Sequence, residues 1–159
     1  MMTTTPELEP LNRLVGNWVT EATHRALPGV VVHGTASIEW LEGHRFLILR
    51  SRNDHPDFPD AISIIGFTDV DRVDARVDGS SGDSKSRLRM HYFDSRGVFR
   101  VFEMNVDAKA WRLSRDAPGF SQRFTGSFDD GADTIVGTWQ LCEDDVHWND
   151  DLQIVYRRR

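Results

Sequence analysis

The chain has 159 residues, of which 39% are hydrophobic, 28% charged and 10% aromatic. This length suits one globular domain with a buried core, so we expect residues 1–159 to form a single domain. Its one cysteine, Cys142, excludes an intramolecular disulfide and a cysteine-rich zinc site. The net charge of -6 argues against nucleic-acid partners and against anionic membrane surfaces.

Targeting signals are not evident in the sequence. No apolar run approaches the length of a transmembrane helix. The N-terminal stretch lacks the basic and apolar regions of a secretory signal peptide. We therefore expect a cytoplasmic protein with no membrane partner.

The first predicted element is a short helix within residues 1–15. Thr4 and Glu7 have capping-box spacing, and Pro6 suits a first helical turn. Apolar residues follow at helical spacing, namely Leu8, Leu11, Leu14 and Val15. Gly16 is expected to end this helix, which we expect to flank a larger structure.

The chain after Gly16 predicts β-strands. These segments are rich in Val, Ile, Phe, Trp and Thr, and turn residues such as Pro28-Gly29 and Pro118-Gly119 separate them. The expected strands are 17–25, 31–42, 45–53, 61–68, 86–93, 98–106, 110–116, 120–128, 133–142 and 150–158. An open sheet of this size would leave exposed edges, so we predict an all-β, antiparallel up-and-down barrel of about ten strands.

Two longer connections interrupt the strands. Residues 53–60 contain two prolines and several acids, and we expect their charges to be solvated. The run 79–84 is rich in Gly and Ser and predicts the tip of a hairpin.

Alternation predicts which side chains point into the barrel. If Trp18 points inward, His24 does so too and reaches the open end. The inward face of strand 98–106 stays undecided. One face carries Arg100, the other carries Glu103, and both are otherwise mainly apolar. A buried lone charge is costly. This strand therefore predicts a charged partner inside, a hydrated cavity with a polar ligand group, or an outward apolar face covered by a dimer partner.

The tripeptide Gly16-Asn17-Trp18 follows the helix and opens the first strand. It resembles the signature of the calycins, a group that includes the lipocalins and the fatty-acid-binding proteins. In that pattern the tryptophan closes one end of the barrel and a basic residue late in the last strand stacks on it. The resemblance implies that Arg157 or Arg158 stacks on Trp18, and Arg158 lies on the face assigned inward.

Residues 40–47 and 65–69 resemble the paired strands of small bacterial lipocalin-like proteins of unknown function. This resemblance implies a barrel with an interior cavity. The nitrobindin-like branch binds haem through a histidine near its C-terminus, where this chain offers only His147. Because Asp144 and Asp145 precede His147, we expect an exposed loop there, without haem or another cofactor. The histidines lack HExxH and H-x-H spacing, so we expect no metal site.

The favoured function is the binding of a small hydrophobic or amphipathic molecule in the barrel. Apolar walls with a few polar groups are typical of such cavities. The expected walls are Trp40, Met90, Tyr92, Trp111, Phe124 and Trp139, and the expected polar groups are His24, Glu103, Arg115 and Gln122.

Two alternatives stay open. One is an isomerase or cyclase acting on a small metabolite, with His24 and Glu103 as acid and base and Arg115 stabilising an oxyanion. The other is a non-catalytic homodimer, whose barrel is occupied by its own side chains and pairs through an exposed sheet face.

Overall fold

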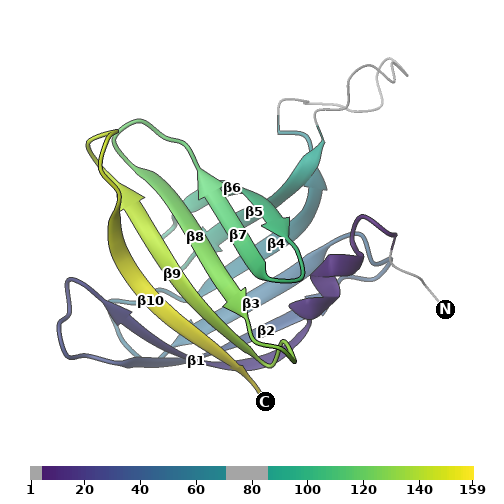
Figure 1. Ribbon diagram of the computed structural model, residues 1–159, viewed down its shortest axis with the longest axis horizontal. Coiled ribbons are helices and arrows are strands. Elements are labelled where there is room, and N and C mark those ends of the chain that lie inside the picture. Colours follow the sequence, from purple (N-terminus) through teal and green to yellow (C-terminus); the bar gives the residue numbers. More distant parts are fainter. Residues whose placement is uncertain (1–4, 71–85) are drawn as a thin grey trace.

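The computed structural model describes residues 5–70 and 86–159. Within these ranges, ten antiparallel strands form one closed barrel, in which strands adjacent in sequence pair and β1 pairs with β10 (Figure 1). They are β1 (Gly16–His24), β2 (Val32–Trp40), β3 (Leu47–Asn53), β4 (Ala61–Thr68), β5 (Arg87–Asp94), β6 (Phe99–Val106), β7 (Ala110–Arg115), β8 (Ser121–Phe128), β9 (Thr134–Cys142) and β10 (Asn149–Arg158). The predicted all-β barrel is confirmed. The expected hairpin tip at 79–84 lies outside the described residues.

The N-terminal helix differs from its prediction. It is a five-residue 3-10 helix, η1 (Glu9–Arg13), preceded by Leu8, which makes no side-chain cap. Thr4, the expected cap, lies outside the described residues. The bonds from Leu11 N to Leu8 O and from Leu14 N to Leu11 O, both 3.0 Å, have the i to i+3 spacing of a 3-10 helix. Pro10 has no backbone N–H to extend an α-helical ladder.

The helix η1 lies against one end of the barrel (purple in Figure 1). Leu11 and Leu14 are buried there, and Trp18 beside them is fully buried. The indole Nε1 of Trp18 donates to the carbonyl of Leu14 at 2.9 Å. No helix of the described ranges is long and apolar enough to cross a membrane.

Arg158 from β10 covers one face of the Trp18 ring. The Arg158 guanidinium carbon lies 4.2 Å from the Trp18 ring centroid. Its nitrogens donate to the carbonyls of Val15, Arg13 and Ala132 and to the carboxylate of Asp133. The contact therefore joins the N-terminal segment, the β8–β9 turn and the last strand at the closed end.

The alternation of buried and exposed residues along β6 shows which face of this strand points inward, which the sequence left undecided. Phe102, Met104 and Val106 are buried, whereas Glu103 and Asn105 are exposed. The face that carries Arg100 therefore points into the barrel. On β2, His33 is exposed on the outer face.

Two glycines opposite each other on β8 and β9 make room for a large ring. Gly126 and Gly137 are paired across the strands, and the Phe124 ring lies against Gly137. A Cβ at Gly137 would stand 2.5 Å from Cε1 of Phe124. Phe124 in turn contacts Trp111 and Trp139, with ring centroids 5.0 and 5.1 Å away. These rings form the core below the open end.

Candidate ligand-binding cavity

The end of the barrel farthest from η1 holds a cavity of about 530 Å³. The strands β1, β5, β6, β8, β9 and β10 contribute to its wall, together with the loops between them. Its lining residues are His24, Arg25, Ala26, Asp57, Phe58, Pro59, Tyr92, Arg96, Arg100, Phe102, Phe120, Gln122, Trp139, Leu141, Asp151 and Leu152. A concave wall of this size with convergent polar groups is the usual form of a small-molecule site.

Aromatic rings form the deeper part of the cavity wall. Phe102 lies between Tyr92 and Trp139, with ring centroids 6.4 and 5.4 Å away, and both contacts are edge-to-face. Because alternate residues of a strand share a face, Tyr92, Phe102 and Trp139 all point inward from β5, β6 and β9. Leu141 and Leu152 add aliphatic surface. This wall suits a flat, apolar ligand body.

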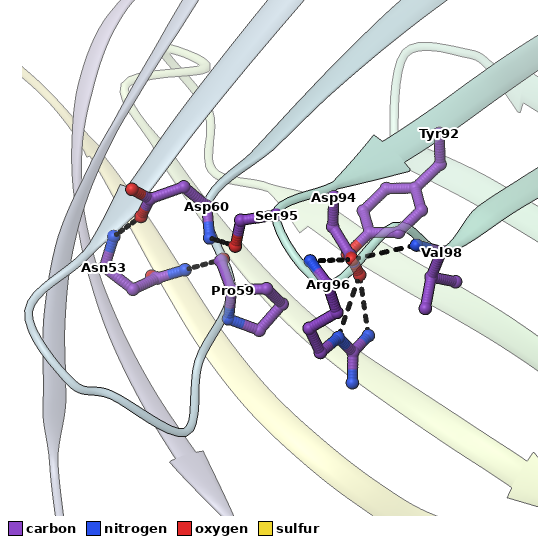
Figure 2. Close-up of polar contacts among 8 residues, drawn as sticks. All are labelled: Asn53, Pro59, Asp60, Tyr92, Asp94, Ser95, Arg96 and Val98. Atoms are coloured by element: carbon purple, nitrogen blue, oxygen red, sulfur yellow. Dashed lines mark hydrogen bonds and ion pairs between the residues drawn. The ribbon is translucent and has the colours of Figure 1, made fainter.

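The loop between β3 and β4 forms one side of the mouth. Phe58 from this loop lies edge-on to His24, with centroids 6.2 Å apart. The Asn53 amide donates to the Pro59 carbonyl at 2.9 Å, and the Asn53 backbone N–H donates to Asp60 at 3.0 Å (Figure 2). Asp60 N–H donates to Ser95 Oγ at 3.1 Å (Figure 2). The loop is thereby fastened to the β5–β6 turn.

A buried carboxylate organises that same turn. The Asp94 side chain is fully buried and accepts hydrogen bonds from the Tyr92 hydroxyl at 2.8 Å and from Arg96 Nη2 at 2.6 Å (Figure 2). It also accepts from the backbone N–H groups of Arg96 and Val98. Burial alone would raise the pKa of Asp94, but these hydrogen bonds outweigh it and hold the pKa well below its ordinary value. The negative charge of Asp94 is therefore already compensated by Arg96 and by the groups that donate hydrogen bonds to it.

Tyr92 shares this environment and stays protonated. Burial raises the pKa of its hydroxyl well above the ordinary value, and the hydrogen bond to Asp94 raises it further. The hydroxyl donates its proton to Asp94. Tyr92 therefore presents its ring to the cavity while its polar atom is occupied.

His24 is held by groups on both sides of its ring. The Ala26 backbone N–H donates to His24 Nδ1 at 3.0 Å, and His24 Nε2 lies 3.2 Å from an Asp151 oxygen. The proton of the neutral ring is therefore on Nε2, which donates to Asp151. Because the lone pair on Nδ1 already accepts a backbone bond, His24 is poorly placed to act as a base.

A β-bulge aims Asp151 at this histidine. The pairing of β10 with β9 shifts between Asp150 and Leu152, which leaves Asp151 as the extra residue. The same Asp151 oxygen lies 3.2 Å from Arg25 Nε, and Arg25 Nη2 lies 3.2 Å from Glu143. At the rim near β1 and β10, the positive charge of Arg25 is therefore shared between two carboxylates.

Four predicted binding residues line the cavity, namely His24, Tyr92, Gln122 and Trp139. Met90, Trp111 and Phe124 are buried in the core instead, with exposed fractions of 4% or less. Trp40 lies near the closed end, where its Nε1 donates to Asn12 at 2.9 Å and its ring stacks on His44. Arg115 donates to the carbonyl of Phe120 at 3.0 Å and supports the turn behind the wall.

The expectation that Glu103 faces the cavity is wrong. Glu103 lies on the outer face of β6, where 47% of its side chain is exposed and it pairs with Arg89 at 3.3 Å. The proposed acid–base pair of His24 and Glu103 is therefore separated by the barrel wall. This placement removes the catalytic arrangement predicted from the sequence.

His147 lies on the exposed loop between β9 and β10. Its side chain is 76% exposed, and its Nδ1 lies 2.6 Å from Asp144 Oδ2. Bonds from the His147 backbone N–H and ring hold the pKa of Asp144 well below its ordinary value. Within residues 5–70 and 86–159, no three His, Cys, Asp or Glu side chains are grouped to hold a metal ion.

The sequence analysis named neither Arg100 nor Phe102 as a site residue. Arg100 points inward from β6, and its guanidinium carbon lies 5.0 Å from the Phe120 ring centroid. Gln122 from β8 lines the same cavity, and its buried Oε1 has no hydrogen-bond partner among the described residues. The charge on strand 98–106 was the available signal for Arg100.

Comparisons with known proteins support the fold. No protein-family model and no curated protein matches the chain. Among solved structures, Rv2717c from M. tuberculosis is similar, with a TM-score of 0.63 and 13% identity over 99% of each chain. The S-type phycobiliprotein lyase CPES from Guillardia theta is similar with a TM-score of 0.50 and 9% identity, over 95% of this chain and 91% of that one. At these identities the similarities concern the overall fold alone.

Proposed function

We propose that this protein binds a small, mostly apolar molecule in the open end of its barrel. The observation that carries the proposal is the cavity of about 530 Å³ with aromatic walls from three strands. This volume lies within the usual range of small-molecule sites. The similarity to a phycobiliprotein lyase supports a barrel of the lipocalin-like kind, although its chemistry belongs to that protein.

A fluorescent apolar probe tests the proposal directly. N-phenyl-1-naphthylamine is nearly dark in water and emits strongly in an apolar site, so titration of the protein with this probe measures binding. We expect saturable binding with a dissociation constant in the micromolar range, which corresponds to a binding free energy of about −8 kcal/mol. Absence of a saturable signal would contradict the proposal.

A cavity-blocking variant locates the bound probe. Leu152 points into the cavity, whereas Gln153 beside it on β10 is exposed on the outer face. Leu152→Trp is expected to weaken probe binding at least tenfold because the indole occupies the cavity. Gln153→Trp adds the same ring outside and is expected to leave binding unchanged. Thermal melts followed by circular dichroism establish that both variants fold.

An apolar patch on the outer face favours a second property, self-association. Phe93 and Phe99 stack with centroids 5.0 Å apart, and Phe99 is 56% exposed. Ile62 pairs with Phe93 across β4 and β5 and extends the patch. We propose that two copies of the chain pair through this face. Light scattering coupled to size exclusion is expected to show a dimer that Phe99→Ser converts to a monomer, and a monomeric wild type would refute this.

A further inference from the structure

Building on the proposed binding function, we infer that the ligand is an amphipathic organic anion whose charged group is held by Arg100. The cavity wall contains the arginines Arg25, Arg96 and Arg100. Arg25 is paired with Asp151 and Glu143, and Arg96 is paired with Asp94. Arg100 makes no ion pair and no hydrogen bond with any residue in the described part of the chain.

The surroundings of Arg100 make this isolation costly. Arg100 is partly buried, and its guanidinium carbon lies 5.0 Å from the centroid of the Phe120 ring. Burial lowers the pKa of Arg100, repulsion from Arg115 and Arg96 lowers it further, and Tyr92 and Asp94 act in the opposite direction. The group still carries its charge at neutral pH, because arginine does not deprotonate in proteins. An anion bound there would compensate a charge that the protein leaves uncompensated.

A second polar side chain lies in the same cavity wall. The amide of Gln122 lines the cavity, and its buried Oε1 has no partner within the described residues. The NH₂ group of this amide is a hydrogen-bond donor. Arg100 and Gln122 would both be able to donate hydrogen bonds to one anionic group of a bound ligand. Charge-assisted bonds of this kind are among the strongest polar contacts in proteins.

The described acidic residues near the cavity do not pair with Arg100. Asp151 is engaged by His24 and Arg25, and Asp94 by Arg96 and Tyr92. Asp57 lies in the exposed mouth loop. Below Arg100, Phe102 and Trp139 provide an apolar surface. The wall therefore matches a ligand with one anionic end and an apolar, ring-sized body.

Two probes that share one ring system test this inference. N-phenyl-1-naphthylamine is neutral, and 8-anilinonaphthalene-1-sulfonate carries the same rings with a sulfonate. We expect the wild type to bind the sulfonate more tightly than the neutral probe. Arg100→Gln is expected to weaken sulfonate binding roughly tenfold and to change neutral-probe binding by less than about twofold. Arg52→Gln, on the exposed outer face of β3, is the charge-matched control and is expected to bind both probes like the wild type.

The outcomes separate the inference from the proposed function. Failure of the neutral probe to bind the wild type would refute the binding function. If the neutral probe binds but Arg100→Gln leaves sulfonate affinity unchanged, or weakens both probes equally, the function stands and the role of Arg100 is refuted. A sulfonate signal that survives in Leu152→Trp arises outside the cavity and also counts against it. Arg100→Lys keeps the charge, and we expect it to retain sulfonate affinity within about threefold. Loss of sulfonate binding in this variant as well would indicate a general loss of folding on substitution at this position.

Discussion

Arg158 on the last strand lies directly opposite Trp18 on the first, and its guanidinium covers the indole face at 4.2 Å. The pair lies at the junction where the barrel closes. It also reaches beyond the two strands, because Trp18 donates to Leu14 and Arg158 donates to Val15, Arg13 and Ala132. One arginine thus donates to backbone carbonyl groups of both the N-terminal segment and the β8–β9 turn.

Loss of this arginine is expected to destabilise the barrel. Arg158→Met keeps the aliphatic stem but removes the hydrogen bonds and the cation–π contact, which predicts a fall of about 2–4 kcal/mol in the free energy of unfolding. Urea unfolding followed by tryptophan fluorescence measures it. The neighbouring Arg157 is exposed and pairs only with Glu21 at 3.4 Å within the described chain. Arg157→Met is therefore expected to cost less than about 0.5 kcal/mol, and equal effects of the two substitutions would contradict the assigned role.

Asp94 predicts a pH-dependent contribution to stability. Its folded-state pKa lies below the ordinary value of 3.8, so as the pH falls the unfolded chain takes up the proton first. The stabilisation is therefore complete above about pH 4 and declines below it. Asp94→Asn is expected to lower the free energy of unfolding by about 1–3 kcal/mol at pH 7, with a smaller difference at pH 3. Urea titrations at both pH values test this, with Asp116→Asn as a control that removes an exposed carboxylate.

The two tyrosines are expected to resist ionisation. Burial raises the pKa of Tyr156 to about 12, and burial with the Asp94 bond raises that of Tyr92 as well. Because the unfolded chain ionises first, this contribution to stability is complete below pH 10 and is lost as the pH rises toward 12. Absorbance at 295 nm should show no tyrosinate in the folded protein at pH 10, and about half ionisation in guanidinium chloride. A folded-state titration centred near pH 10 would show that a phenol is exposed.

The contact between Phe124 and Gly137 predicts a steric effect of one methyl group. Gly137→Ala would place Cβ at 2.5 Å from the Phe124 ring, and overpacking of this kind costs roughly 1–3 kcal/mol. Val136→Ala, on the exposed neighbouring position, is expected to change stability by less than about 0.5 kcal/mol. Adding Phe124→Leu to Gly137→Ala should cost less than the sum of the two single changes. Simple additivity in urea unfolding would show that the ring does not meet the added methyl group.

Alternation and turn residues were sufficient to predict the barrel. They indicate inside or outside along each strand, and the inward set of Trp18, Thr20 and Ala22 follows that rule. Depth within the barrel is a different quantity, because it depends on register between strands. Trp139 reaches the cavity while Trp111, equally inward, is buried beneath Phe124. Sequence patterns therefore predicted inward residues without separating the cavity wall from the core.

Local irregularities account for other missed residues. Phe58 belongs to a loop expected to hold solvated acids, yet it packs on His24. Asp151 reaches His24 only because of a bulge, and bulges leave no clear signal in alternation. On β6, the adjacent outward pair of Glu103 and Asn105 was a usable sign that the Arg100 face is the inner one.

In the described barrel, every strand pairing except β1 with β10 joins neighbours along the sequence. Each hairpin closes a loop that is short compared with the separation of β1 and β10, which are the two most distant strands along the chain. This seam is therefore the natural candidate for the slowest step in folding. A circular permutant that links β10 to β1 and opens another hairpin would turn the seam into a local contact. The position of the slow step would then follow the site of chain opening, while the finished barrel stays the same.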